Sequence, residues 1–236
     1  ETANAAISLT TSGDIVISGA NTVIGTNTLT IQPLSTGGTI GVGAGATGTL
    51  NLDATDIAGL KDGFSSITIG RVDGTGLVTV GAITFTDPVT IRAGGATGDI
   101  TVSGAVATTG NTGVTLNAGQ AVTLNSTITT GNVTVVRTTG NDVATTGSIS
   151  VTAGTTITGD ASGRLITGAA VVDTTEANGG TDTATSGTIT LSAGGAIQLA
   201  SPNALTVGAA TANDGGASGT STSTTGAITV SAADKL

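Results

Sequence analysis

One eight-residue pattern decides the fold: it reads Gly147-Ser-Ile-Ser-Val-Thr-Ala-Gly154, returns as Gly187-Thr-Ile-Thr-Leu-Ser-Ala-Gly194 and begins again as Gly226-Ala-Ile-Thr-Val-Ser-Ala232. The first isoleucines of the three copies, Ile149, Ile189 and Ile228, are 40 and 39 residues apart. In each copy, aliphatic residues alternate with Ser or Thr, which is the period of a β-strand with one apolar face. The pattern therefore predicts a strand that recurs once in every turn of a repeating structure.

Two further apolar positions follow within each full copy at intervals of about eight residues, as a strand, a tight turn and the next strand require. The second position is Ile157 or Ile197, and the third is Leu165 or Leu205. Gly, Asn and Asp lie between these positions and supply the turns. Each repeat is thus predicted to contain three short strands.

The same alternating unit occurs throughout the rest of the chain, at residues 14–17, 28–31, 49–52, 66–69, 99–102, 113–116, 121–124 and 132–135. Such strands cannot each bury an apolar row alone, so they must stack on their neighbours. We predict an all-β fold, a single right-handed parallel β-solenoid over residues 1–236, with about ten coils of roughly 20–25 residues. A β-sandwich is the alternative, but it is typically built on hairpin turns and aromatic core anchors.

The composition excludes several classes of function. The chain has no His and no Cys, so it lacks an imidazole base, a thiolate nucleophile and a Cys/His zinc site. Six Lys and Arg against 15 Asp and Glu leave a net charge of −9, which opposes binding to nucleic acid. Thr, Gly and Asn interrupt the uncharged stretches too often for a transmembrane helix, so we expect no membrane insertion. These features favour a protein that is not an enzyme.

Three segments depart from the regular pattern. Residues 51–93 are not repetitive and hold both aromatic residues of the chain. Within them, Ile57, Leu60 and Phe64 have the spacing of one short helical turn packed against the stack. Residues 168–186 and 208–225 are polar, and we expect them to be loops that bulge from one corner of the solenoid.

The string Gly63-Phe-Ser-Ser-Ile-Thr-Ile-Gly-Arg71, followed by Asp73-Gly-Thr-Gly76 and Phe85-Thr-Asp-Pro-Val-Thr-Ile-Arg92, resembles the repeat regions of large secreted bacterial β-strand-repeat proteins, similar to filamentous haemagglutinin-like adhesins. The resemblance implies a right-handed β-helical shaft exported to the cell surface, with a role in adhesion, matrix or filament formation. The Asn-Pro-Asn motifs of that family's secretion domain are absent here. The resemblance therefore implies a shaft rather than an export signal.

Four aspartates in the non-repetitive segment, Asp53, Asp56, Asp62 and Asp73, are candidate ligands for calcium, because carboxylates are the ligands that Ca²⁺ prefers. Their spacing matches no calcium loop, and we interpret them first as solvated or helix-capping groups. Carboxylates also serve as acid and base in glycosidases, but no aromatic platform for sugar stacking accompanies them. We predict no organic cofactor.

Outward threonines raise the alternative of a ligand-binding module, either for glycans or for ice. We expect one flat file built from Thr101, Thr115, Thr123, Thr134, Thr190, Thr206 and Thr229. Paired outward threonines do not recur in every coil, however, and Thr is in any case the polar residue best suited to strands.

The ends of the chain suggest a mode of assembly. Ile7 and Leu9 lie in a strand-like segment at the start, and Ile228 and Val230 lie in the unfinished last repeat. Neither end carries a recognisable cap, and an exposed coil offers unpaired backbone groups to another chain. Two interpretations follow: the chain is a segment of a longer shaft, or it is a subunit that stacks head-to-tail into a homopolymer, in which the heterologous contact propagates into a filament.

Overall fold

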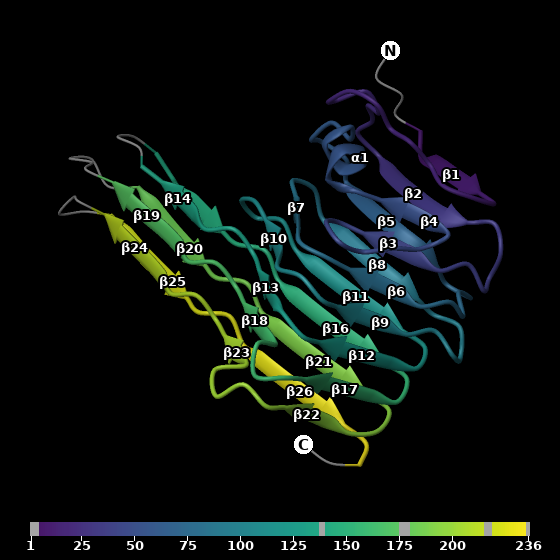
Figure 1. Ribbon diagram of the computed structural model, residues 1–236. Coiled ribbons are helices and arrows are strands. Elements are labelled where there is room, and N and C mark those ends of the chain that lie inside the picture. The colour runs from purple at the N-terminus through teal and green to yellow at the C-terminus, as the bar shows by residue number, and fades with distance from the viewer. Residues whose placement is uncertain (1–4, 137–139, 175–179, 215–218, 235–236) are drawn as a thin grey trace.

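The computed structural model describes residues 5–136, 140–174, 180–214 and 219–234. About half of the chain is strand and 2% is helix. Parallel strands stack coil upon coil from the N-terminal end to the C-terminal end (Figure 1). The prediction of a parallel β-solenoid is confirmed.

Three parallel sheets form the body of the solenoid. The eight-stranded sheet consists of β1 (Ile7–Thr11), β2 (Thr28–Pro33), β5 (Ser66–Arg71), β8 (Val89–Ala93), β11 (Val114–Ala118), β16 (Ile149–Ala153), β21 (Ile189–Ala193) and β26 (Ile228–Ala232). The seven-stranded sheet consists of β4 (Leu50–Leu52), β3 (Ile40–Val42), β6 (Val78–Val80), β9 (Ile100–Val102), β12 (Ala121–Leu124), β17 (Thr156–Gly159) and β22 (Ile197–Leu199). The five-stranded sheet consists of β7 (Ile83–Phe85), β10 (Val106–Thr108), β13 (Thr127–Thr129), β18 (Arg164–Ile166) and β23 (Leu205–Thr206).

Aliphatic rows that run along the solenoid axis form the core. In the eight-stranded sheet the first inward row is Ile7, Leu29, Ile67, Val89, Val114, Ile149, Ile189 and Ile228. The predicted 40- and 39-residue repeats lie in register in this row. The second and third apolar positions of the repeat are also aligned between coils, in β17 and β22 and in β18 and β23. Burial of each such side chain contributes about 1.5–3 kcal/mol, so the rows are the main stabilising element.

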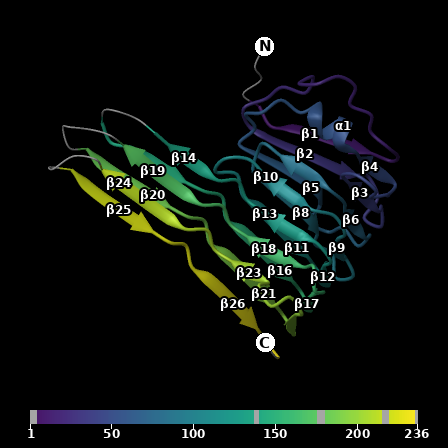
Figure 2. The ribbon, with the colours of Figure 1, turned by 60° about the vertical axis from the view of Figure 1, so that its left-hand side comes forward.

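A smaller body, which we call the wing, projects from the corner between the five-stranded and eight-stranded sheets (Figures 1 and 2). In three consecutive coils the chain runs outward from this corner and returns before it enters the eight-stranded sheet. The outgoing wing sheet consists of β14 (Val133–Val135), β19 (Ala170–Thr174) and β24 (Ala210–Asp214). The returning wing sheet consists of β15 (Val143–Thr145), β20 (Thr181–Thr185) and β25 (Thr220–Thr224). Ala144, Ala170, Val172 and Ala184 are fully buried between the two sheets.

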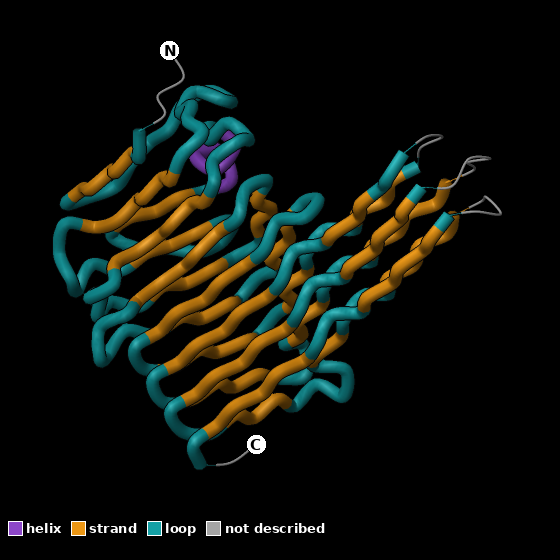
Figure 3. Tube along the Cα trace, turned by 180° about the vertical axis from the view of Figure 1, so that it is seen from behind, coloured by secondary structure: helices purple, strands orange, loops and turns teal. Residues whose placement is uncertain are grey.

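The wing corrects the prediction of polar loops at residues 168–186 and 208–225. Their described parts are strands, seen from behind in Figure 3, while residues 175–179 and 215–218 lie outside the described residues. The inner positions of the wing are mostly alanine, so the alternation has little hydrophobic contrast, and the polar Asp182 is also buried. Residues 132–135, predicted as an ordinary coil strand, form the first strand of this body.

Long coils explain why there are fewer of them than predicted: the wing lengthens the lower coils, and the coil from Leu29 to Ile67, which contains α1, takes 38 residues. A coil without a wing, from Val89 to Val114, takes 25 residues. The next one, from Val114 to Ile149, takes 35 residues because it includes β14 and β15. The eight strands of this sheet, one in each coil, show that the described residues form fewer coils than the ten expected from a uniform coil length.

One helical turn, α1 (Ala54–Ala58), lies at the upper end of the stack, and a short helical turn was predicted within residues 51–93. Ile57 lies within it, while Leu60 and Phe64 follow it, and all three side chains are buried. The strand predicted at residues 14–17 is absent. The backbone of this segment bonds to a side chain instead of a neighbouring strand: Ile17 N–H donates to Asp56 Oδ1 at 2.7 Å.

Candidate functional site

Two of the predicted calcium ligands, Asp53 and Asp56, form the N-terminal capping box of α1. Asp53 Oδ1 accepts the backbone N–H groups of Thr55 at 2.7 Å and of Asp56 at 3.0 Å. Asp56 Oδ2 accepts the N–H of Asp53 at 3.0 Å, which completes a capping box. These backbone donors lower the pKa of the Asp53 carboxyl below its ordinary value. Asp56 also holds the helix against the segment that carries Ile17, because its Oδ1 accepts the N–H of Ile17.

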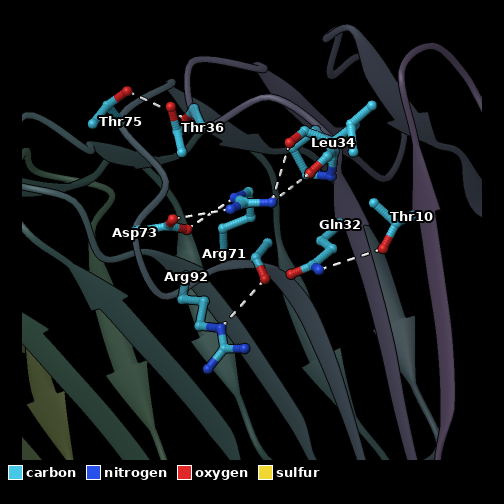
Figure 4. Close-up of polar contacts among 10 residues, drawn as sticks. Thr10, Gln32, Leu34, Thr36, Arg71, Asp73, Thr75 and Arg92 are labelled. Carbon is cyan, nitrogen blue, oxygen red and sulfur yellow. Dashed lines mark hydrogen bonds and ion pairs between the residues drawn. The ribbon is translucent and has the colours of Figure 1, made fainter.

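The third candidate, Asp73, forms an ion pair with Arg71 (Figure 4). Arg71 Nε and Nη2 each donate to one oxygen of Asp73 at 2.9 Å. Arg71 Nη1 also donates to the carbonyl oxygens of Pro33 and Leu34 in the coil above. The guanidinium lowers the pKa of the Asp73 carboxyl. Asp73 thus orients an arginine that links two coils.

The fourth candidate, Asp62, lies near a carboxylate that the sequence analysis did not select. Asp87 is 3% exposed, its Oδ1 accepts the N–H of Gly63 at 2.9 Å, and its Oδ2 is buried without a hydrogen-bond partner. Burial raises the pKa of the Asp87 carboxyl, and the charge of Asp62 adds to that rise. No pattern in the sequence distinguishes Asp87 from the exposed aspartates.

The structure does not bring the four predicted ligands together. No group of three or more His, Cys, Asp or Glu that could hold a metal ion occurs within the described residues. The hollow below α1, with a volume of about 720 Å³, is lined mainly by Ala, Ile, Leu and Thr, with Asp62 and Asn21 at its polar side. It contains no pair of groups arranged for acid–base chemistry.

Outward threonines do form a file, but not the predicted one. The residues expected in a single file are divided among the sheets, because Thr101 and Thr123 lie on the seven-stranded sheet, Thr206 on the five-stranded sheet and Thr134 on the wing. The eight-stranded sheet carries its own continuous file: Ser8, Thr30, Thr68, Thr90, Thr115, Ser150, Thr190 and Thr229. A hydroxyl-bearing residue therefore recurs on each of its eight strands.

A second outward file on the same sheet is mixed. It contains Arg92, Asn117, Thr152, Ser192 and Ser231 in consecutive strands. The face thus has one regular row of hydroxyls beside one irregular row.

The base of the wing is a buried polar network, which we call the neck. Thr130 Oγ1 donates to the Gly147 carbonyl at 2.9 Å and accepts the N–H of Gly168 at 2.9 Å. Thr146 Oγ1 repeats this arrangement, donating to the carbonyl of Gly168 and accepting the N–H of Gly187. Each hydroxyl therefore bonds the outgoing segment to the returning one and one coil to the next. Repeated Thr-Gly or Ser-Gly dipeptides are the sequence signal for this network.

The residues predicted as assembly ends occupy the two edges of one sheet. Ile7 and Leu9 belong to β1, and Ile228 and Val230 belong to β26, which are the first and last strands of the eight-stranded sheet. All four side chains point into the core rows, yet each is only partly buried or is exposed. Ile228 is 46% exposed, whereas Ile189 above it is fully buried.

The upper and lower ends of the stack differ. At the lower end β26, β22, β23, β24 and β25 are all end strands of their sheets. At the upper end, β1 and β4 are end strands, and α1 and Leu60 lie above the β7 end of the five-stranded sheet and close part of the interior. The two ends of the stack are therefore not equivalent, and the lower end has more unpaired strand edges.

Comparison with protein-family models, curated proteins and solved structures finds no match to this chain. The resemblance to filamentous haemagglutinin-like repeats accordingly stays a prediction. Within the described residues, no helix has the length and apolar character needed to cross a bilayer.

Proposed function

We propose that this chain is a structural protein without enzymatic activity, a β-solenoid shaft that lengthens when further coils stack on its lower edge. The observation that carries the proposal is the exposure of Ile228 at the end of a row whose other members from Leu29 to Ile189 are buried. A coil placed below β26 would bury that side chain and pair the free side of the strand. Both gains favour continued stacking.

In a head-to-tail contact, β26 of one copy lies beside β1 of the next. Ile228 and Val230 then continue into Ile7 and Leu9, so both core rows pass through the junction with aliphatic residues on each side. The contact is heterologous, and it propagates because each added copy leaves the same edge free. The shaft would be extracellular, at a bacterial cell surface or in a matrix, as the resemblance to secreted adhesin repeats implies.

The experiment compares the purified chain with an Ile228→Lys variant by electron microscopy and sedimentation velocity over a range of concentrations. We expect fibres, or rods of varied length, from the unmodified chain. The variant should give only short rods, because a lysine in the core row would bury a charge in the contact between two copies. Thr152→Lys, which adds the same charge on the outer face of β16, is the control and should assemble like the unmodified chain. Short rods of one length from the unmodified chain at every concentration would overturn self-assembly.

The continuous file of Thr and Ser favours a second candidate, an ice-binding face. Neighbouring strands are about 4.8 Å apart, so the file presents hydroxyls at a regular spacing over eight strands. Thermal hysteresis and inhibition of ice recrystallisation test this candidate. Thr115→Lys, in the middle of the file, should abolish any such activity, and a chain without activity would exclude it.

A further inference from the structure

The wing strands that return to the body continue into the eight-stranded sheet without a change of direction. β20 and β25 are followed by β21 and β26, and each pair runs the same way (Figures 1 and 2). The outgoing wing strands, which cover the inner side of the returning sheet, come instead from the five-stranded sheet across the core. The outer sides of the returning wing sheet and of the eight-stranded sheet therefore form one surface.

The step between the two sheets keeps the same kind of residue on the outside. Thr145 and Ser148 are both exposed, because the two residues between them, 146–147, are both buried. The next coil repeats the step, with residues 186–187 buried between Thr185 and the exposed Thr188. The outward alternation thus passes from the wing to the body in the same way in two consecutive coils.

The register of the strands aligns the outward residues of the three wing coils into five columns. Four columns follow from the pairing of β15, β20 and β25 and of β16, β21 and β26. The middle column lies at the step, where Thr188 N–H donates to Ser148 Oγ at 3.0 Å. All positions except Val143 and Ala227 carry a hydroxyl. We call this surface the hydroxyl face; its columns are Val143, Thr183 and Thr222; Thr145, Thr185 and Thr224; Ser148, Thr188 and Ala227; Ser150, Thr190 and Thr229; and Thr152, Ser192 and Ser231.

The hydroxyl face exposes no charged side chain, although the whole chain has a net charge of −9. Within residues 143–152, 181–192 and 220–231 the one charged residue is Asp182, which is 1% exposed. Above the wing, the same sheet places Arg92 and Asn117 in its second outward file. The regular array of hydroxyls is therefore confined to the coils that carry the wing.

The repeat of the array limits the kind of ligand that fits it. Its hydroxyl-bearing residues are about 4.8 Å apart from coil to coil and about 6.6 Å apart along each strand. The face has no charge for an ionic ligand, and both Phe side chains of the protein are buried, so no aromatic ring is available to stack on a sugar. A repeating array of weak hydrogen-bonding groups matches a ligand that is itself a lattice of such groups, as ice is.

We infer that the hydroxyl face is an ice-binding surface, and that the wing widens the single Thr and Ser file of the eight-stranded sheet into a two-dimensional array. This inference rests on the ice-binding candidate and adds the wing to it. Each threonine offers a hydroxyl that bonds to water and a methyl group that orders the water beside it. Many such contacts made at once hold a lattice plane more firmly than one row does.

Two lysine substitutions on the wing test the inference. Thr185→Lys, in the middle strand of the returning sheet, should raise the concentration that inhibits ice recrystallisation by at least about tenfold, because a hydrated charge interrupts the array. The fraction of protein taken up into slowly grown ice should fall with it. Thr211→Lys, exposed on the outgoing sheet of the same wing, is the control and should act like the unmodified chain.

Thr222→Lys repeats the test at an exposed position on β25, where no strand of this sheet lies below, so that a Thr185→Lys chain that fails to fold does not decide the outcome. Circular dichroism and thermal unfolding identify the folded variants. Full activity in a folded Thr185→Lys or Thr222→Lys chain would overturn the inference, as would equal losses in these variants and in Thr211→Lys.

The variant Thr115→Lys separates this inference from the candidate on which it rests, because Thr115 lies in the Thr and Ser file above the wing coils. Loss of activity in Thr115→Lys, with full activity in both wing variants, would leave the ice-binding file in place and overturn the role of the wing. An unmodified chain that neither inhibits recrystallisation nor enters ice would overturn both.

Discussion

The hydroxyl of Thr130 donates a hydrogen bond of 2.9 Å to the carbonyl oxygen of Gly147, across the narrow base of the wing. Thr130 and Gly147 are 17 positions apart in the sequence, and the whole first excursion of the wing lies between them. Because the same hydroxyl accepts the N–H of Gly168, it bonds three segments at one point. The wing is thus held to the body by a buried polar network as well as by the chain itself.

Replacement of Thr130 by Val should destabilise the protein by about 2–4 kcal/mol. The side chain is 1% exposed, and Val keeps its shape while removing the hydroxyl. The Gly168 N–H and the Gly147 carbonyl then stay buried without that partner. Urea unfolding measures the change. Thr152→Val, made on the outer face of β16, is the control and should change stability by less than about 0.5 kcal/mol. Equal effects of the two substitutions would contradict a supporting role for the neck.

Replacement of Gly168 by Ala should also destabilise the wing, by about 1–3 kcal/mol. A Cβ at this position would lie 2.0 Å from the carbonyl oxygen of Gly131 in the coil above, so the two coils would have to separate. Amide hydrogen exchange should show the loss of protection concentrated in β14 and β19. Gly13→Ala is the control, because no atom lies within 4 Å of a Cβ placed there. A Gly168→Ala variant as stable as this control would show that the neck tolerates wider spacing.

The sequence predicts the body of the solenoid well, for a clear physical reason. Ile149, Ile189 and Ile228 are large aliphatic residues in a strict alternation with Ser and Thr, and a core row has few other ways to form. Ile7 and Ile228 lie in the first and last strands of one sheet, and their role in assembly stays a prediction. Local hydrophobic contrast was sufficient to predict the core rows.

The strands of the wing and the burial of Asp56 and Asp87 could not be predicted from local sequence patterns. In the wing, inward alanines such as Ala170 and Ala184 differ little in hydrophobicity from the outward threonines, so strands resemble polar loops. Asp56 and Asp87 accept hydrogen bonds from the backbone N–H groups of Ile17 and Gly63, which are 39 and 24 positions away in the sequence. The capping of α1 by Asp53 and the pairing of Asp73 with Arg71 are local contacts, and helix capping was among the predicted roles, whereas the burial of Asp56 and Asp87 depends on tertiary contacts.

The capping role of Asp56 predicts that calcium has no effect on stability through this residue. Asp56→Ala should cost about 2–4 kcal/mol, because the N–H groups of Ile17 and Asp53 lose their acceptor. Thermal unfolding with added calcium and with a chelator should give the same loss. Asp73→Ala is the control and should change stability much less, as expected of an exposed ion pair. A calcium-dependent rise in the unfolding temperature that Asp56→Ala removes would instead assign Asp56 to a metal site.

The buried carboxyl of Asp87 predicts a distinctive dependence of stability on pH. Because burial raises its pKa in the folded state, the folded protein binds more protons than the unfolded chain just above the usual pKa of 3.8. The free energy of unfolding attributable to this group therefore rises as the pH falls through that window. Asp87→Asn keeps an oxygen that accepts the N–H of Gly63 and removes the charge. It should be more stable than the unmodified chain at pH 7 and should lose this pH-dependent contribution.

Asp73→Asn supplies a control of opposite sign for the same measurement. Arg71 lowers the pKa of Asp73 in the folded state, so its contribution to stability is present above the usual pKa and is lost as the pH falls below it. Urea unfolding at a series of pH values from neutral to acidic measures both variants against the unmodified chain. At neutral pH, Asp87→Asn should be more stable than the unmodified chain and Asp73→Asn less stable. Both differences in the free energy of unfolding should shrink on acidification, because the two carboxyls become protonated. An Asp87→Asn chain that is less stable at pH 7 would show that the carboxylate is held by a partner and not by burial alone.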